Sequence, residues 1–416
     1  MPSATAARRR ALLFILLTVT LDAIGIGILI PVMPKLLLDL SGPGVEHAAV
    51  LAGWLTAVFA LVQFVAAPVL GALSDRFGRR PVLLVSLAAF GVSYGVMAIA
   101  PNLGWVFLAQ VLTGLFGATP STAGAFIADV TPPEARTRNF GSMAAAFGSG
   151  LVIGPALGGL LVDRGTRIPF FASAALSLVT VAYGYFVLPE SLPQDRRRAF
   201  AWRRANPLGA VLEVRRVGGV SRFLAALLLQ RVATQTLPTI WPFFTMATLG
   251  WTPRNVGYSL AGYGLVTIFI QLWLIGKIDR RVGSQITASA ALLLLAAGYL
   301  GMTFGHAVPQ MGQWIVIACV PLTAMGFMAG PALTSLLSSA VSSDTQGTLQ
   351  GVIASLTCVA SVLTPLTMPW VFSAFSGPGR GTLPGMPFLI SAVLSIAGLF
   401  ILRPRTRDAV ADAQVR

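Results

Sequence analysis

Long apolar runs recur along the whole chain and constrain its fold more than any other feature. Residues 11–21 and 288–300, for example, contain no charged side chain, and only 10% of the 416 residues are charged, against about 25% in a soluble domain. A helix needs about 20 apolar residues to cross the bilayer core, where only helices or closed barrels satisfy the backbone. Because the runs are continuous rather than alternating, they indicate helices. The sequence therefore predicts an all-α integral membrane protein.

The runs divide into twelve predicted transmembrane spans separated by short polar loops. We place the spans at residues 11–37, 51–73, 82–100, 103–127, 139–162, 169–189, 221–248, 255–277, 285–304, 312–337, 349–373 and 385–402. An even number of spans puts both termini on the same side of the membrane. Asp22 interrupts the first run and no clear cleavage site follows, which favours an uncleaved helix over a signal peptide.

The net charge of +15 is distributed in a way that orients the chain. Most of the 29 Lys and Arg residues fall in the termini and in the alternate loops on the same side, among them 76–80 and 196–222. Cytoplasmic loops carry such an excess, so we expect both termini in the cytoplasm and a bacterial-type cytoplasmic (inner) membrane. Because the basic residues are dispersed between apolar spans, we predict no nucleic-acid partner.

The longest polar segment lies in the middle of the chain. Residues 190–220 are rich in Arg and contain two prolines, so we predict a cytoplasmic linker between a bundle at 1–189 and a bundle with a short tail at 221–416. An internal repeat supports this division, because glycines seven apart beside basic residues occur at 71–78 and again at 276–283. Two related halves with a site between them at mid-membrane is a known transporter plan.

The first copy of the repeat is the sharpest motif in the chain. Its glycines allow a tight turn between two spans, and Asp75 can accept hydrogen bonds from a helix N-terminus. The charge rule alone explains the arginines but not the glycine spacing. Asp129, at the inner end of the fourth span, either helps an inner gate or caps a helix. The motif residues are Gly71, Asp75, Arg76, Gly78, Arg79 and Arg80.

Small residues dominate the fifth span. Glycines four positions apart let two helices approach closely, and a proline bends the helix by removing a backbone hydrogen bond. The residues concerned are Gly150, Gly154, Pro155, Gly158 and Gly159. Ordinary helix packing is the alternative explanation for them.

By resemblance, these motifs identify the chain as a member of the major facilitator superfamily. Gly71-Ala-Leu-Ser-Asp-Arg-Phe-Gly-Arg-Arg80 resembles the loop motif of that superfamily, and the motif of the fifth span resembles the one that marks its drug/proton antiporters. Leu21-Asp-Ala-Ile-Gly-Ile-Gly-Ile-Leu-Ile-Pro-Val-Met-Pro34 is similar to the first helix of the tetracycline/proton antiporters. The resemblance covers nearly the whole chain. It implies twelve helices in two six-helix halves, alternating access, and a charged loop that locks the cytoplasmic gate, with Asp75 facing the eleventh span.

The chain departs from those antiporters inside the predicted spans. They carry an acidic residue where Ser93 stands, an arginine in place of Gln110 and a histidine in place of Thr267. They also have an acidic residue in the ninth span, where the run 288–300 has none. These differences predict a substrate other than tetracycline.

One acidic and one basic residue lie well inside the predicted spans. Asp22 occupies the first span and Arg231 the seventh. A charge at mid-membrane costs on the order of 3 kcal/mol, so we expect Asp22 to face a cavity as a proton site or substrate contact. Alternatively, it is a structural partner of a polar neighbour. The two residues could pair in the absence of substrate. Arg231 could instead recognise an anionic group, bind helix carbonyls or sit near the inner interface.

Other polar and aromatic side chains of the spans are candidates for the wall of a substrate cavity. The glutamines could hydrogen-bond a ligand, although interhelical hydrogen bonds explain them as well. Lipid contact or core packing would equally explain the aromatic residues. The candidates are Gln63, Gln110, Gln235, Trp241, Tyr263 and Gln271.

The sequence indicates secondary transport rather than catalysis. It contains no Gly-x-x-x-x-Gly-Lys-Ser/Thr phosphate loop and no readable metal or catalytic cluster, so we predict neither an enzyme nor a cofactor. One proton moving inward gains about 2.3 kcal/mol per 100 mV, which is an adequate driving force. We predict a monomeric proton-coupled exporter of a small amphipathic or partly anionic compound. A metabolite symporter or facilitator is the alternative, and a membrane sensor or embedded enzyme is the rival from another class.

Overall fold

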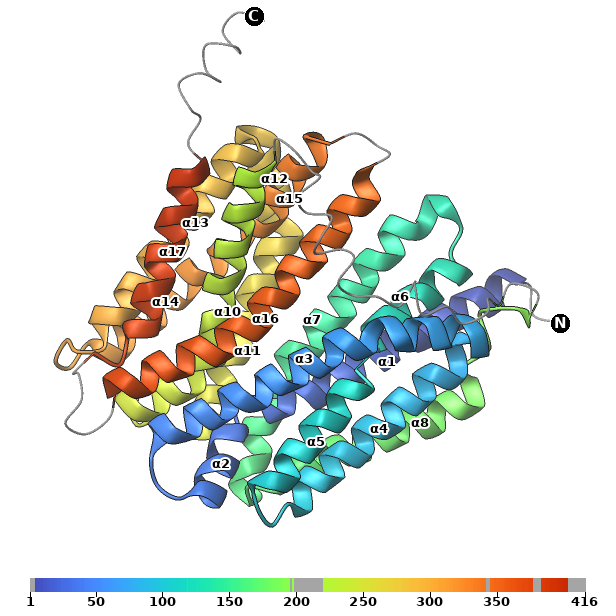
Figure 1. The fold of residues 1–416 in the computed structure, drawn as a ribbon, viewed down its shortest axis with the longest axis horizontal. Coiled ribbons are helices and arrows are strands. Elements are labelled where there is room, and N and C mark those ends of the chain that lie inside the picture. Colours follow the sequence, from blue (N-terminus) through green and yellow to red (C-terminus); the bar gives the residue numbers. More distant parts are fainter. Residues whose placement is uncertain are drawn as a thin grey trace, which may run out of the picture. The chain divides into compact units, whose positions relative to one another are not determined.

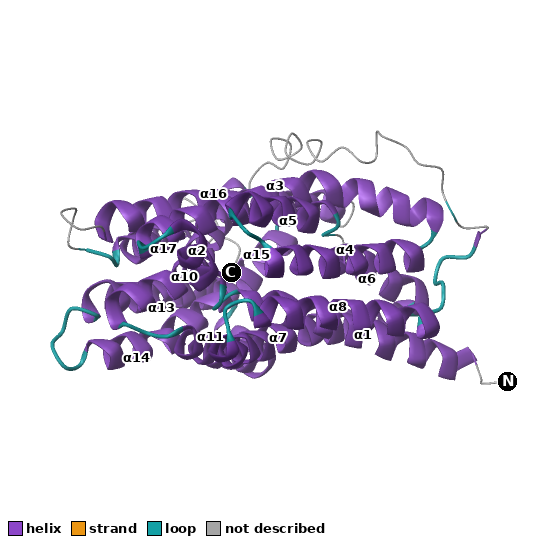
Figure 2. Cartoon of the chain, turned by 90° about the horizontal axis from the view of Figure 1, so that it is seen from below, coloured by secondary structure: helices purple, strands orange, loops and turns teal. Residues whose placement is uncertain are grey.

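The computed structural model describes residues 4–117, 119–194, 197, 220–341, 345–376 and 383–402, and nearly all of them are helical (Figures 1 and 2). Within these ranges there is no strand. The predicted linker at 190–220 falls mostly outside the described residues.

Among the described residues, the N-terminal part of the chain contains two short 3₁₀ helices and eight α-helices. The predicted first span is divided between two of them, because the chain turns at Ile30, Pro31 and Val32. The predicted fourth span is likewise interrupted near Phe116 and Gly117. The helices are α1 (Ala4–Leu29), α2 (Met33–Ser41), α3 (Val45–Phe77), α4 (Arg79–Ile99), α5 (Leu103–Leu115), α6 (Thr119–Val130), α7 (Arg136–Leu161) and α8 (Ile168–Val187).

The C-terminal part of the chain has a second series of helices. A π-helical turn, Ile270–Leu274, joins α11 to α12, and a 3₁₀ turn, Gly326–Met328, joins α14 to α15. The helices are α10 (Ser221–Leu249), α11 (Pro253–Phe269), α12 (Ile275–Val282), α13 (Ser284–Gly305), α14 (Gly312–Met325), α15 (Ala329–Ser339), α16 (Gln346–Ser376) and α17 (Met386–Leu402).

The lengths of these helices fit a membrane protein. In the described part of the chain, nine continuous helical segments are long and apolar enough to cross a bilayer. The helices α5 and α17 are shorter but apolar, and α10 runs for 29 residues. Together they account for the twelve predicted spans, so the all-α transmembrane architecture is confirmed.

The chain divides into two compact units. The first comprises Met1–Leu208, Ile240–Ile268 and Pro365–Ser373, and the second comprises Gly209–Thr239, Phe269–Thr364 and Ala374–Arg416. Parts of α10, α11 and α16 therefore pack with the N-terminal helices. The predicted division at 190–220 into two six-helix bundles remains a prediction.

Three helices have residues in both units (α10, α11 and α16), and each has an irregular backbone feature near the point of division. Pro238 precedes the break in α10, Pro365 begins the first-unit part of α16, and the π turn follows the break after Ile268. A proline removes a backbone hydrogen bond and a π turn interrupts the regular ladder. These helices are therefore easiest to bend where they pass from one unit to the other.

The first unit has an apolar core where α1, α4 and α6 meet. Phe14, Leu87, Phe126 and Ile127 are buried in it, and the cluster extends along α1 as far as Val19. The core thus ends one helical turn before Asp22, the acidic residue of the predicted first span.

Candidate functional site

The glycines of the fifth-span motif bring α7 into backbone contact with α1. A Cβ atom at Gly154 would lie 2.7 Å from the Cα atom of Gly27, and one at Gly150 would lie 2.5 Å from the carbonyl oxygen of Thr20. Gly158, one turn further on, meets the backbone of Ile28 in the same way. Because the three glycines are four positions apart, they form one face that fixes the stretch of α1 containing Asp22.

The same motif touches α11 with its other side. Gly257 lies against the carbonyl of Pro155, and a Cβ atom at Gly159 would lie 3.0 Å from the Cα atom of Arg254. An ion pair closes this contact, with Arg254 Nη1 lying 3.3 Å from Asp163 Oδ2. The motif therefore packs α7 between α1 and α11 within the first unit, and its predicted antiporter role remains a prediction.

Asp22 is the only charged side chain in the described residues that is almost fully buried, with 5% of its surface exposed. Its Oδ1 atom has no hydrogen-bond partner among those residues. The phenol of Tyr94, on α4, is close enough to interact electrostatically with the carboxylate. A Cβ atom at Gly25, one turn after Asp22, would lie 3.5 Å from the Tyr94 ring. Asp22 is therefore buried on α1, one helical turn before the contact of that helix with Tyr94 of α4.

Arg231 lies in the second unit, half-buried on α10. Its neighbour Gln230 is only 1% exposed. Both face Gly330 of α15, where a Cβ atom would lie 3.5 Å from Gln230 Oε1 and 3.8 Å from Arg231 Cζ. Gln230 Oε1 and Arg231 Nε are buried without a hydrogen-bond partner among the described residues. Gln230 was not among the predicted site residues. A glutamine beside an arginine in an apolar run could have indicated it as a polar group of the site. The proposed pairing of Asp22 with Arg231 remains a prediction, because the two lie in different units.

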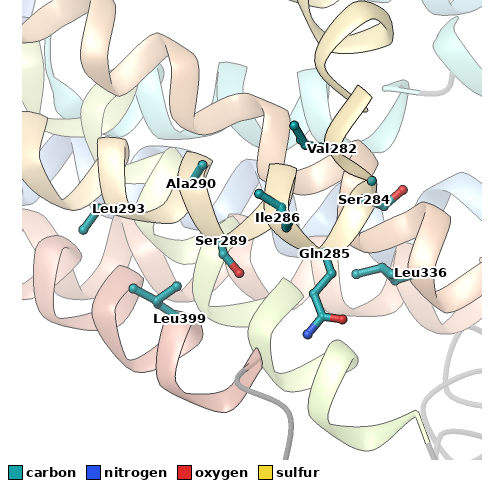
Figure 3. A pocket seen from close by; sticks show the side chains of 10 residues that line it. Val282, Ser284, Gln285, Ile286, Ser289, Ala290, Leu293, Leu336 and Leu399 are labelled. Carbon is teal, nitrogen blue, oxygen red and sulfur yellow. The ribbon is translucent and has the colours of Figure 1, made fainter. Parts of the chain in front are cut away.

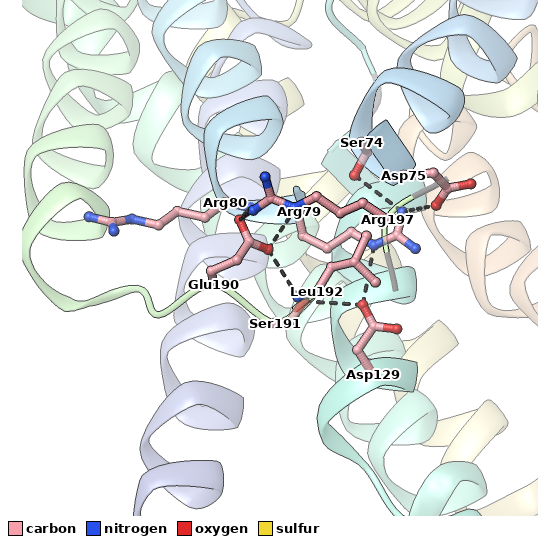
Figure 4. A network of polar contacts seen from close by, with 9 residues as sticks. All are labelled: Ser74, Asp75, Arg79, Arg80, Asp129, Glu190, Ser191, Leu192 and Arg197. Carbon is pink, nitrogen blue, oxygen red and sulfur yellow. Dashed lines mark hydrogen bonds and ion pairs between the residues drawn. The ribbon is translucent and has the colours of Figure 1, made fainter. Parts of the chain in front are cut away.

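The charged motif at the junction of α3 and α4 takes part in a network that we call the loop network (Figure 4). The network consists of Asp75, Arg79, Asp129 and Glu190. Arg79 Nη1 lies 2.6 Å from Asp75 Oδ1, and Arg79 Nε lies 3.2 Å from Asp129 Oδ2. Ser191 donates to Asp129 Oδ2 at 3.1 Å. Asp129 therefore contacts the motif, and its two predicted roles, in the inner gate or as a helix cap, remain predictions.

Glu190 was not among the predicted site residues, yet it caps the N-terminus of α4. Its carboxylate accepts hydrogen bonds from the backbone N–H of Arg79 at 2.8 Å, of Arg80 at 3.3 Å and of Leu192 at 3.0 Å. A carboxylate at this position satisfies orphan N–H groups and interacts favourably with the helix dipole. Gly78, with φ of 106°, supplies the turn that opens α4 to it.

The remaining motif residues lie around this network. Arg80 donates to the carbonyl of Tyr185, and its guanidinium also lies 5.7 Å from the centre of that ring. Arg76 is exposed, with its guanidinium 5.1 Å from the centre of the Phe77 ring. The prediction that both glycines form the turn is wrong for Gly71, which lies inside α3 and is half-buried; a Cβ atom there would meet nothing within 4 Å. The predicted contact of Asp75 with the eleventh span remains a prediction, since that helix begins in the other unit.

Two of the cavity candidates already have hydrogen-bond partners inside the protein. Gln63 donates to the carbonyl oxygen of Gly117 at 2.7 Å, which ties α3 to the break between α5 and α6. Trp241 is 1% exposed and donates to Ser259 at 2.8 Å. These contacts favour the structural explanations of both residues. The other candidates are half-buried or exposed: Gln110, Gln235, Tyr263 and Gln271.

Comparison with known proteins places this geometry in a family. Residues 15–365 match the Major Facilitator Superfamily. The tetracycline resistance protein, class C, of Escherichia coli is 37% identical, with 94% of this chain and 96% of that protein covered. The class H protein of Pasteurella multocida is 32% identical, with 96% and 98% covered.

Solved structures share the fold at lower identity. A nucleoside transporter aligns with a TM-score of 0.78 at 13% identity, covering 95% of this chain and 100% of that one. A D-xylose-proton symporter aligns with a TM-score of 0.73 at 18% identity, covering 95% and 96%. The predicted resemblance is thus confirmed: this chain belongs to the Major Facilitator Superfamily and is similar over nearly its whole length to tetracycline resistance proteins.

Proposed function

We propose that this chain is a proton-coupled secondary transporter that exports a small amphipathic, partly anionic compound by alternating access. The observation that carries the proposal is the buried carboxylate of Asp22, which has no ion-pair partner in the described part of the chain. Relatives named as tetracycline resistance proteins and a multidrug resistance protein of Bacillus subtilis at 26% identity support drug export.

Asp22 would carry the proton. An isolated ionised carboxylate in apolar surroundings is costly, so such a group tends to take up a proton instead. The backbone contacts of Gly150 and Gly154 hold α1 rigidly beside α7. A change of charge at Asp22 would then act on the packing of α1 against α4 at Tyr94 rather than being absorbed by a flexible loop.

The buried polar groups at Arg231 and Gln230 would contact the substrate. A guanidinium presents planar, paired donors to carboxylate-like oxygens, and Arg231 Nε and Gln230 Oε1 lack partners among the described residues. Gly330 presents no side chain to either group. An anionic group of the substrate would therefore satisfy Arg231 while Gln230 accepts a hydrogen bond from a neighbouring hydroxyl or amide.

The loop network would stabilise one state of the cycle on the cytoplasmic side. Arg79 connects three elements through Asp75 and Asp129, while Glu190 ties the end of α8 to the start of α4. The same proposal includes a location in a bacterial-type inner membrane with both termini in the cytoplasm. It also includes a monomeric state and the proton gradient as the only energy source.

A resistance screen followed by vesicle transport tests the proposal. Cells expressing the wild type, Asp22→Asn or Asp39→Asn are exposed to a panel of amphipathic compounds that includes tetracycline. Asp39 is an exposed carboxylate on α2, so its amide variant is the matched control. We expect resistance with the wild type and with Asp39→Asn, and loss of resistance with Asp22→Asn.

Transport in everted vesicles then separates export from the alternatives. A compound selected by the screen should accumulate against its gradient, and a protonophore should abolish that accumulation. Accumulation that persists after the proton gradient collapses, or flux that only ever runs downhill, would favour the facilitator instead. The departures at Ser93, Gln110 and Thr267 lead us to expect that tetracycline is not the best substrate.

A further inference from the structure

A groove on the second unit uses none of the residues of the candidate site. It has a volume of about 660 Å³ and runs along α13 from Ser284 to Leu293, with Leu336 of α15 and Leu399 of α17 also lining it (Figure 3). At a rise of 1.5 Å per residue, this stretch of α13 is roughly 13 Å long. The groove is therefore long enough for an extended ligand rather than a single ion.

One end of the groove is polar. The hydroxyl of Ser289 lines it and has no hydrogen-bond partner among the described residues. Gln285 is held at its edge by donating to the carbonyl oxygen of Leu402 at 3.2 Å. Ser284 is engaged with Asp279 and Ser335, each at 3.2 Å. Ser289 is thus the hydroxyl that remains available to a ligand.

The segment of chain that leads into this end of the groove is positively charged. Exposed Arg280 and Arg281 directly precede Val282, the first residue of the groove. Arg280 donates to the carbonyl of its own helix at Gly276, whereas Arg281 has no ion pair with any residue in the described ranges. The helix that leads into the groove, α12, carries three cations, Lys277 included, against the single carboxylate of Asp279, which is a net charge of +2.

The other end of the groove is apolar and faces the membrane. Ala290 and Leu293 on α13 are exposed, Leu293 to 57%, and α13 is one of the helices that can span a bilayer. Lipid is therefore the solvent for these side chains. A ligand that fits both ends must combine an anionic head with an apolar tail.

We infer that this groove binds one anionic phospholipid. Its phosphate lies beside Arg281 and Ser289, and an acyl chain lies along Ala290, Leu293 and Leu399. Phosphate oxygens accept strong hydrogen bonds from a guanidinium, and each nearby cation strengthens binding of anionic lipid by about fivefold. The inference requires that the chain spans a membrane and does not depend on proton-coupled export, so either can fail without the other.

Native mass spectrometry of the purified full-length protein in detergent tests the site. The protein is titrated with dioleoylphosphatidylglycerol and, as the neutral probe, dioleoylphosphatidylcholine. We expect one phosphatidylglycerol to bind in preference to phosphatidylcholine. The double variant Arg280→Gln/Arg281→Gln should lose about 25-fold in affinity for phosphatidylglycerol, because two cations are removed, with little change for phosphatidylcholine. Ala290→Trp fills the apolar end and should weaken both lipids.

Arg138→Gln provides the matched control, because it removes an exposed cation from α7 in the first unit. It should bind both lipids as the wild type does. All four substituted side chains are exposed, so the variants are expected to fold, and their thermal unfolding temperatures verify this. The inference is overturned by equal binding of the two lipids, by equal losses in Arg138→Gln and the double variant, or by no effect of Ala290→Trp. A dimer that disappears in Ala290→Trp would instead assign the groove to a second copy of the chain.

Discussion

The close approach of α1 and α7 makes a quantitative prediction for Gly154→Ala. A Cβ atom at this position would lie 2.7 Å from both the Cα atom of Gly27 and the carbonyl oxygen of Ile24. Both are backbone atoms, so no side-chain rotation can relieve the overlap. The two helices must separate, and the contact along Gly150 and Gly158 must loosen with them.

The size of the effect follows from a comparison within the same helix. Gly141 also lies in α7, but a Cβ atom there would meet nothing within 4 Å. In a helix, alanine is more stable than glycine by roughly 0.5–1 kcal/mol, so Gly141→Ala should be neutral or slightly stabilising. Overpacking costs typically about 1–3 kcal/mol. Gly154→Ala should therefore be less stable than Gly141→Ala by about that amount.

Thermal unfolding of the two purified variants in the same detergent measures the difference. We expect Gly154→Ala to unfold several degrees below Gly141→Ala, and to lose transport because the position of Asp22 depends on this contact. Gly27→Ala should behave like Gly154→Ala, since its Cβ atom would lie 3.0 Å from Gly154 Cα. If Gly154→Ala is as stable and active as Gly141→Ala, the argument that this glycine face fixes α1 is refuted.

Three further predictions concern other parts of the chain. Glu190→Gln should lower the unfolding temperature and reduce transport, because a charged cap of α4 contributes on the order of 1 kcal/mol. Glu134→Gln, at an exposed glutamate, is the control. Equal unfolding temperatures and transport rates of the two variants would contradict the capping role. Arg231→Gln should raise the KM for anionic compounds at least tenfold in vesicle uptake while neutral compounds are little affected, and an equal change for both classes would remove Arg231 from recognition. Pro365→Ala should restore a backbone hydrogen bond in α16 and so raise the unfolding temperature. It should also slow turnover, because α16 would bend less easily at this position; unchanged turnover would contradict bending there.

Much of the fold was predictable from the sequence because membrane-spanning helices are specified by length and polarity. The predicted spans at 139–162 and 285–304 agree closely with α7 and α13. The breaks in the first and fourth spans were missed, although Pro31 and Gly117 mark them. Apolar composition alone cannot locate such breaks, because the segments before and after each break are both apolar enough to lie in lipid.

The polar contacts were less predictable, because they depend on residues far apart in the chain. Glu190 accepts from Arg79 across 111 positions, and nothing local to either residue indicates this pair. Trp241 was a candidate for the cavity wall, yet its indole donates to Ser259 in the first unit. Only the fold brings these groups together, whereas the glycine spacing at 150–158 predicted a helix contact without any knowledge of the partner.

Proton movement driven by substrate tests the central claim most directly. Purified protein is sealed in liposomes with a pH-sensitive dye inside, and a gradient of a compound selected by the resistance screen is imposed without any pH difference. We predict that the compound gradient drives protons in the opposite direction in the wild type and in Asp39→Asn, and that this proton flux is absent in Asp22→Asn. Compound flux without proton movement in the wild type, or undiminished proton movement in Asp22→Asn, would contradict the assignment of Asp22 as the coupling carboxylate.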